Sequence, residues 1–457
     1  MASEADDIFH PLFQRSWFTR MWTVQEIVLN PFGILNCGGI TLPWADVILA
    51  ADVLDKIGYK YGGWQKVLAL QKYLTVALAI KTYPQARDII NRNNLRDDIA
   101  DIDIDFDVFR TFHYGREKEA SDPKDKIYAL HGILTEFGVN LPAPDYRKTL
   151  EEIYTEATLT LMEHDQSLVV LHFATSANRR KGLPSWVPDF TDQPFDEQDP
   201  RFPVTRSRFG AGGSMEAQWE SRLTSLQLLM RGKMIDRVMY RGQGLPSIDP
   251  REVKLKELLR LDDSGQLVAT ESLRNLHKSI QVFQEWCDVA QWSDSYPNGQ
   301  TTKDALRTAL LNDFPRSMND YTRNAAFEPW LQYMSKVAED SSQGASTQIA
   351  TEFDLVTALF TGPGFPFYTL AMPFCANKTL YRTEKGWLGT APDFTPDPIQ
   401  AGDMIATIRG MEMPVVLRPS DATGGYRLIS HCYVHGWMYG EGWDDGSEYR
   451  ETGILLV

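Results

Sequence analysis

The chain has 457 residues, 43% of them hydrophobic, so it can bury the cores of two or three globular domains and is not intrinsically disordered. Its formal net charge is −15, and the only short basic cluster, residues 179–181, is too small to offset that charge. Because a strongly acidic chain is repelled by nucleic-acid phosphates and anionic lipid, we expect neither nucleic acid nor membrane as a partner.

The four cysteines and the N-terminal residues indicate the cellular compartment of the protein. Cys37, Cys287, Cys375 and Cys432 show no CxxC spacing, which predicts neither a disulfide framework nor a local zinc site. The N-terminus lacks a basic stretch followed by an apolar core, and no apolar run approaches about 18 residues. We therefore expect a cytoplasmic protein with reduced thiols.

The first predicted element is a largely buried helix over residues 16–29, with Ser16 as its N-cap. Its apolar residues recur at spacings of three and four in two stripes, Trp17, Met21, Val24 and Val28 on one and Phe18, Trp22 and Leu29 on the other. Glu26 falls within the second stripe, so this carboxylate is expected to be buried beside Phe18 and Trp22.

Several helices are predicted next along the chain. A helical run over 44–92 breaks near glycines 62 and 63, and the polar stretch 91–105 is expected to be a loop or hinge. A helix over 121–131 starts with Asp122 as N-cap and Pro123 in its first turn, and Gly132 is expected to end it. Asp125 is assigned to its first turn, where a carboxylate interacts favourably with the helix dipole. Lys126 is assigned to its solvated face. An amphipathic helix follows over 148–164.

The middle of the chain is predicted to be mixed. Two prolines three residues apart force an extended segment over 182–190. Residues 223–240 predict two short strands around Gly232, and 270–340 returns to helical spacing.

The last ninety residues alternate strand-like runs with Gly, Pro and Asp, which predicts a small antiparallel β module such as a barrel. Within it, residues 426–438 are expected to form a central strand. Residues 413–419, bounded by prolines, are expected to form an edge strand. The apolar stretch 359–374 should be buried where this module joins the rest of the chain.

Four stretches in this order resemble the fungal heterokaryon-incompatibility (HET) domain proteins. They are "RSWFTRMWTVQEIVL", "SDPKDKIYALHGIL" followed by "DYRKTLEEIYTEAT", "LPSWVPDF", and the closing "GDMIATIRGMEMPVVLRP" with "YRLISHCYVHGWMYGE". The resemblance covers about residues 8–190 and 375–441. The family's "SYxWG"-like and "WID...CINQ"-like blocks are missing before the Trp-rich helix, so the resemblance implies that Met1 falls inside the family's domain and that the domain is N-terminally incomplete.

The resemblance implies a fold class and a division of the chain. The fold class is α+β, with residues 1–45 as the last part of a HET domain similar to TIR domains and 46–190 as a helical HET-associated region. Residues 191–365 would be a mixed middle region and 366–457 the β module.

The resemblance also implies a role in self/non-self recognition and programmed cell death, through a protein partner or a second copy of the chain. Enzymatic TIR domains cleave NAD with a glutamate in an "SxWCxxEL"-like motif, and "SWFTRMWTVQEI" is similar to it with a longer gap. Glu26 would then be the catalytic residue, with Trp17 and Trp22 as substrate-binding residues and NAD as substrate rather than cofactor. The alternatives are that Glu26 caps or pairs within a packed helix, that both tryptophans are core anchors, and that the chain is a non-catalytic interaction scaffold.

Other polar residues give weaker signals. His431 and His435 share a strand face but lack a third metal ligand, so no metal is expected. The carboxylates of "EGWDDGSEYRE", residues 441–451, suit a surface turn better than a hydrolase pair. The GxSxG, GxxxxGK and GxGxxG motifs of three common enzyme classes are absent.

Overall fold

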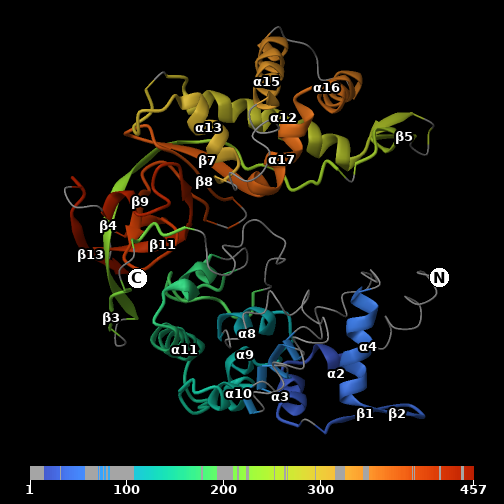
Figure 1. Ribbon diagram of the computed structural model, residues 1–457, viewed down its shortest axis with the longest axis vertical. Coiled ribbons are helices and arrows are strands. Elements are labelled where there is room, and N and C mark those ends of the chain that lie inside the picture. Colours follow the sequence, from blue (N-terminus) through green and yellow to red (C-terminus); the bar gives the residue numbers. More distant parts are fainter. Residues whose placement is uncertain are drawn as a thin grey trace. The chain divides into compact units, whose positions relative to one another are not determined.

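A computed structural model gives two compact units, the first formed by residues 1–173 and 180–194 and the second by 174–179 and 195–457 (Figure 1). The structure describes residues 15–30, 32–56, 70–71, 73–75, 77–78, 81–82, 108–175, 179–192, 209–213, 216–222, 226–251, 253–261, 264, 266–293, 295–313, 325–342, 349–393, 395, 397–420, 424–443 and 447–457. The predicted break at glycines 62 and 63 and the predicted hinge over 91–105 lie outside these residues.

In its described residues, the first unit consists mainly of helices with one small hairpin. The elements described there are α2 (Ser16–Thr19), α3 (Trp22–Val28), β1 (Ile34–Cys37), β2 (Ile40–Pro43), α4 (Trp44–Lys56), α8 (Val108–Gly115), α9 (Asp125–Tyr128), α10 (His131–Glu136), α11 (Leu150–Asp165) and the 3-10 helix η1 (Val169–Ala174). The helix predicted over 148–164 is confirmed as α11, which begins with a capping box between Thr149 and Glu152. Its predicted apolar face is buried at Ile153, Tyr154, Ala157 and Leu161.

The single helix predicted over 16–29 is wrong, because the chain leaves helical geometry at Arg20. There the backbone is extended and pairs with Glu119: the Glu119 N–H donates to the Thr19 carbonyl at 2.6 Å, and the Met21 N–H donates to the Glu119 carbonyl at 2.8 Å. Ser16 is not the N-cap either, since Arg15 occupies that position. A contact between residues about a hundred positions apart thus outweighs the local helical pattern.

The helix predicted over 121–131 is also divided. Asp122 accepts the Lys124 N–H at 3.0 Å, but the helical geometry of α9 begins only at Asp125. Gly132 lies within α10 instead of ending a helix. A Cβ atom there would come within 2.9 Å of the Gln25 side chain of α3, so the glycine lets α10 and α3 approach each other.

Two lysines of this unit are buried, which corrects the solvated face assigned to Lys126. The Lys126 ammonium donates to the carbonyls of Arg116 at 3.0 Å, Gly115 at 3.3 Å and Lys118. Lys118 donates to the Phe18 carbonyl at 3.0 Å. Burial lowers the pKa of Lys118 to about 7 and that of Lys126 to about 8. Both lysines therefore satisfy backbone carbonyls at or near helix ends.

Residues 182–190 are not helical, as predicted, but they turn instead of running extended. The Val187 N–H donates to the Pro184 carbonyl at 2.9 Å, which closes a turn. Trp186 and Val187 are fully buried by this turn. The nearby Asp189 carboxylate accepts from the Arg180 and Thr191 N–H groups at 3.0 and 2.9 Å, so the segment is held in place at both ends.

The second unit combines a large sheet with a group of helices. Its strands are β3 (Trp219–Arg222), β4 (Gln227–Arg241), β5 (Leu259–Leu261), β6 (Leu267–Ala269), β7 (Lys378–Thr383), β8 (Leu388–Pro392), β9 (Met404–Ile408), β10 (Val415–Ser420), β11 (Gly425–His431), β12 (Tyr433–Val434) and β13 (Glu451–Leu456). Its helices are η3 (Leu255–Glu257), α12 (Glu271–Ala290), α13 (Thr302–Leu310), α15 (Phe327–Ser342), α16 (Ile349–Thr361), α17 (Phe365–Cys375) and η4 (Glu441–Trp443). The helical spacing predicted over 270–340 is confirmed by α12, α13 and α15.

Five strands close into a ring, which confirms the expectation of a barrel. β4 pairs with β13, β13 with β11, β11 with β10, β10 with β9, and β9 again with β4. All these pairs are antiparallel except β11–β13. Beyond the ring, β4 continues the sheet to β7, β8 and β12, and β3 also pairs with β4. The sheet therefore includes two strands that precede the expected module boundary at residue 366.

The strand assignments need three corrections. Residues 227–241 form one strand instead of two, because Gly232 lies inside β4, where a Cβ atom would come within 2.7 Å of the Thr407 carbonyl oxygen. β10, predicted at an edge, lies between β9 and β11, although Pro419 extends past the end of β9 and pairs only with β11. The strand predicted over 426–438 ends at His431, and β12 then pairs with β8.

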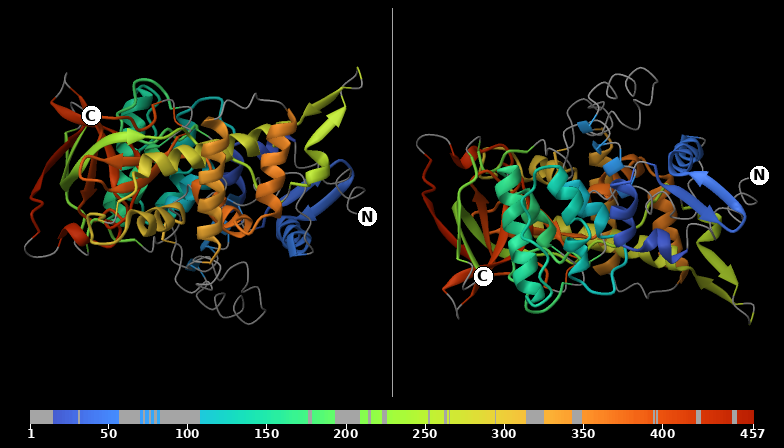
Figure 2. Two further views of the ribbon diagram at one scale, coloured as in Figure 1. Left: turned by 90° about the horizontal axis from the view of Figure 1, so that it is seen from above. Right: turned by 90° about the horizontal axis from the view of Figure 1, so that it is seen from below.

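The helices of this unit cover the extension of the sheet. α12 contacts β7 and α13 contacts β8. Figure 1 shows these helices together with α15, α16 and α17 on one side of β7 and β8, and both views in Figure 2 show the orange helices α15 and α16 apart from the red strands. Phe367, Tyr368 and Met372 of α17 are buried in the core shared by helices and strands. The predicted burial of the stretch 359–374 is confirmed for these residues.

No single helix in the described part of the chain is long and apolar enough to cross a membrane. The segments Glu352–Thr361 and Phe365–Cys375 meet that criterion only as a pair, with a bend of 106° between them.

Candidate functional site

The residues predicted as a catalytic constellation lie in the first unit. The Trp17 indole N–H donates to the Glu26 carboxylate at 3.3 Å. Glu26 is exposed, so the expected burial of its carboxylate is wrong. Trp22 is only half-buried, whereas its neighbour Phe18 is 2% exposed.

Trp17 belongs to an aromatic cluster with Phe18 and Trp44. Its ring centroid lies 5.0 Å from that of Phe18 and 5.7 Å from that of Trp44, both in edge-to-face geometry. Such contacts stabilise a core and fix the indole that donates to Glu26. The structure therefore brings Trp17 and Glu26 together, but it leaves the carboxylate in solvent.

The two histidines of the last strands are buried, and no group of three or more metal-binding side chains occurs among the described residues. His435 Nε2 lies 2.8 Å from the side-chain oxygen of Gln300, and burial lowers the pKa of His435 to about 4. His435 is therefore neutral at physiological pH and serves the packing of the sheet.

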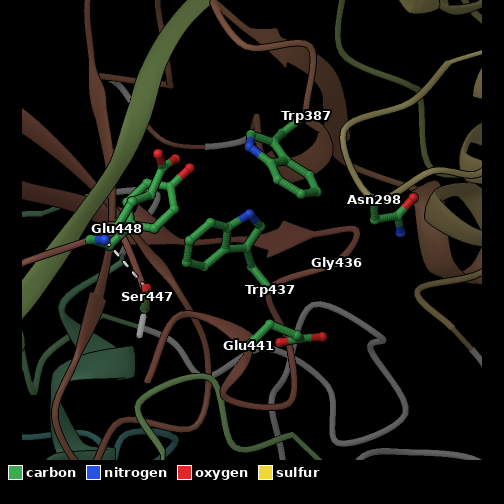
Figure 3. A pocket seen from close by; sticks show the side chains of 8 residues that line it. Asn298, Trp387, Gly436, Trp437, Glu441, Ser447 and Glu448 are labelled. Carbon is green, nitrogen blue, oxygen red and sulfur yellow. Dashed lines mark hydrogen bonds between the residues drawn. The ribbon is translucent and has the colours of Figure 1, made fainter. Parts of the chain in front are cut away.

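A pocket of about 370 Å³ opens in the second unit beside β7, β8 and β12. We call it the tryptophan pocket. It is lined by Asn298, Trp387, Gly436, Trp437, Glu441, Ser447, Glu448 and Tyr449 (Figure 3). Three aromatic side chains dominate the lining, and its two carboxylates come from the acidic stretch that the sequence assigned to a surface turn.

The two tryptophans are positioned by turns that follow strands. Trp387 ends the β7–β8 hairpin turn, where its N–H donates to the Thr383 hydroxyl at 3.0 Å and its carbonyl accepts the Thr383 N–H at 3.0 Å. Trp437 follows β12, and its N–H donates to the Val434 carbonyl at 3.1 Å. Gly436 has a φ of +92°, and a Cβ atom there would come within 2.7 Å of the Trp387 ring, so only glycine fits.

The aromatic rings of the pocket meet edge to face. The Trp387 and Trp437 centroids are 5.6 Å apart and those of Trp437 and Tyr449 are 4.7 Å apart. The Tyr296 ring packs against Trp387 with a centroid distance of 5.5 Å, and its hydroxyl accepts from the Leu388 N–H and donates to the His435 carbonyl. Backbone groups therefore hold the ring that supports Trp387.

Charged groups lie at the rim of the pocket. Glu441 and Glu448 are exposed. The Lys385 ammonium lies 4.4 Å from the Tyr449 ring centroid, 3.0 Å from the Tyr449 hydroxyl and 3.3 Å from the Glu448 carboxylate. A basic side chain thus already occupies part of the aromatic and acidic surface, which is chemistry suited to binding a cation.

Sequence reasoning missed these aromatic residues. The available signal is a glycine directly before a tryptophan, which within the second unit occurs at Gly386–Trp387, Gly436–Trp437 and Gly442–Trp443, each next to a strand end or turn. The first two pairs supply the two tryptophans of the pocket.

Comparison with known proteins shows which family of domains the second unit is similar to. Residues 292–451 match the family model of the Het-6 β-barrel domain. The match contains every residue of the tryptophan pocket and strands β7 to β12, while β4, which closes the ring, precedes it. Residues 292–451 of the second unit are therefore similar to the Het-6 β-barrel domain.

A relative extends the comparison to the rest of the chain. "Heterokaryon incompatibility protein 6, OR allele" of Neurospora crassa is 23% identical over 474 residues, which cover 94% of this chain and 65% of the relative. No solved structure gives a significant match. Both comparisons support the resemblance of this chain to the fungal HET-domain proteins that its sequence motifs indicate.

Proposed function

We propose that this chain acts in heterokaryon incompatibility, the recognition of self and non-self when fungal cells fuse, and that its action ends in programmed death of the fused cell. One observation carries the proposal: the relative named for heterokaryon incompatibility aligns along 94% of the chain. The Het-6 β-barrel domain at residues 292–451 supports the same role.

Within this role, the chain recognises a protein partner, or a second copy of itself, in the cytoplasm. The net charge of −15 supports a protein partner over nucleic acid or membrane. We assign residues 1–45 to a TIR-like part of the HET domain and residues 46–190 to a helical region associated with it. The support for this assignment is the resemblance of "SWFTRMWTVQEI" to the TIR glutamate motif.

The geometry favours recognition over NAD cleavage by Glu26. A glutamate that assists glycosidic bond cleavage acts best in a site that excludes water and holds the substrate. The Glu26 carboxylate is exposed and accepts a hydrogen bond from Trp17 at 3.3 Å. Death would then follow from engagement of a partner rather than from depletion of NAD by this chain.

A fusion assay tests the proposal. A deletion strain and the same strain with the gene restored are each paired with isolates that carry divergent alleles, and growth of the resulting heterokaryons is scored. We expect the restored gene to give inviable or slow heterokaryons with some isolates and the deletion to relieve this effect. Equal growth with and without the gene in every pairing would contradict the proposed role.

A further inference from the structure

We propose that the tryptophan pocket binds a basic side chain, lysine or arginine, carried by an extended segment of a protein partner. In this arrangement the cation contacts the aromatic rings and the rim carboxylates, and a backbone carbonyl of the segment accepts from an indole N–H. The inference concerns a binding site in the second unit and does not depend on the role in incompatibility.

The aromatic lining supplies the first argument. Trp387, Trp437 and Tyr449 lie with neighbouring centroids 5.6 and 4.7 Å apart, at nearly right angles. The face of an aromatic ring carries negative charge density, so perpendicular rings present both faces and edges to an entering group. Recognition of cations by clustered tryptophan and tyrosine rings follows from this electrostatics.

The rim charges supply the second argument. Glu441 and Glu448 place two exposed carboxylates at the same opening, in a chain whose net charge is −15. A cation is attracted both by this local pair and by the field of the whole protein, whereas an anionic group is repelled.

The chain's own Lys385 shows that a basic side chain fits the rim. Its ammonium lies over the Tyr449 ring at 4.4 Å and pairs with Glu448 at 3.3 Å. The Lys385 side chain is 48% exposed, so it can swing away without leaving a buried gap. A partner's lysine or arginine would take over these contacts and compete with Lys385 for them.

The indole N–H groups supply the third argument. Trp387 is 9% and Trp437 3% exposed, and neither Nε1 atom has a hydrogen-bond partner among the described residues. Figure 3 shows the nitrogen atoms of both rings on the sides where the two indoles face each other. Buried donors without an acceptor cost free energy, so a ligand that brings a carbonyl oxygen is favoured over a bare cation. A peptide provides both the carbonyl and the cation.

The probe is a synthetic peptide, acetyl-Ser-Gly-Lys-Gly-Ser-amide, with a second peptide in which glutamine replaces lysine as the neutral control. The full chain, labelled with 15N in its tryptophans, is titrated while the indole N–H resonances are followed by NMR; Trp387→Phe and Trp437→Phe assign the two signals. We expect the lysine peptide to move both resonances with a dissociation constant of about 1 mM and the glutamine peptide to leave them unchanged.

Three exposed substitutions separate this site from unspecific attraction. Glu448→Gln should weaken binding about two- to fivefold, and the double substitution Glu441→Gln with Glu448→Gln about tenfold. Lys385→Gln should strengthen binding about two- to fivefold, because it removes the competing ammonium while making the chain still more acidic. Glu257→Gln, an exposed carboxylate outside the pocket, is the matched control and should leave affinity unchanged.

The outcomes decide the proposal. Equal shifts with both peptides, or weakening by Glu257→Gln as large as by Glu448→Gln, would overturn a specific cation site. Indole resonances that do not move at about 10 mM lysine peptide would overturn it as well, because the affinity would then be less than one-tenth of the expected value. The fusion assay can succeed or fail independently of each of these results.

Discussion

The buried ammonium group of Lys118 predicts how the stability of the first unit depends on pH. Lys118 is 1% exposed and donates to the Phe18 carbonyl at 3.0 Å. Burial lowers its pKa to about 7, an effect that the nearby Lys126 increases and Glu117 opposes. In the unfolded chain the same group has a pKa of about 10.4.

The sign follows from proton counting. Between pH 7 and pH 9 the unfolded state holds the Lys118 proton while the folded state loses it, so the unfolded state binds more protons. The free energy of unfolding must therefore rise with pH in this window. With a folded pKa of about 7, the rise from pH 7 to pH 9 amounts to about 2 kcal/mol.

The comparison is between the wild-type chain and Lys118→Met, which keeps the apolar stem and removes the ammonium. Hydrogen exchange, corrected for the intrinsic rate at each pH, is measured on peptides from α9 to α11 so that the first unit is observed separately. This separation matters because burial raises the pKa of Cys287, Cys375 and Cys432 in the second unit to about 12, which lowers stability at alkaline pH. Parallel pH dependences in wild type and variant would refute the reasoning.

Three further predictions concern stability, chemistry and domain docking. Phe18→Ala should cost about 3 to 5 kcal/mol and Trp22→Ala clearly less, because Phe18 is fully buried and Trp22 only half-buried; urea denaturation of both variants that ranks them in the reverse order would contradict the packing. Purified chain and Glu26→Gln should both release no nicotinamide from NAD by chromatography, and release by wild type that is lost in the variant would establish catalysis. Deletion after residue 374 should cause aggregation, because β7 to β12 share one core with α12 and α17; limited proteolysis that yields a soluble C-terminal fragment cut between residues 340 and 380 would argue against it.

Local signals in the sequence predicted local structure well. The sequence predicts α11 nearly to its ends because its apolar spacing lies within sixteen residues. The sequence predicts a β-barrel, though not its strand pairing, because strand-like runs and turn residues alternate along the last ninety residues.

Contacts distant in sequence caused the errors. The backbone of Glu119 interrupts the helix predicted over 16–29, and nothing near Arg20 signals that pairing. The sequence predicts a break at Gly232 because a glycine weakens a strand, but the close approach of β9 requires it inside β4. The sequence places Lys126 in solvent because it does not reveal that carbonyls of residues 115–118 accept from the Lys126 ammonium.

The candidate pocket combines segments that the sequence separates widely. Asn298, Trp387, Trp437 and Tyr449 line one pocket in a fold where the chain leaves the ring after β11 and β12 pairs with β8. Sequence reasoning identified the acidic stretch at 441–451 but had no means of placing it beside two tryptophans. For Glu26, the pattern predicts burial beside Phe18 and Trp22, but the helix breaks at Arg20, and the exposed carboxylate accepts a hydrogen bond from Trp17 instead.

The central claim is that the chain acts in incompatibility by recognition and not by Glu26 chemistry. The most direct measurement is the viability of heterokaryons formed with one incompatible isolate by strains that carry the wild-type gene, Glu26→Gln, or a deletion of the gene. The account predicts that wild type and Glu26→Gln reduce viability equally and that the deletion restores it. Restoration of viability by Glu26→Gln, with the variant protein present at wild-type level, would contradict the account.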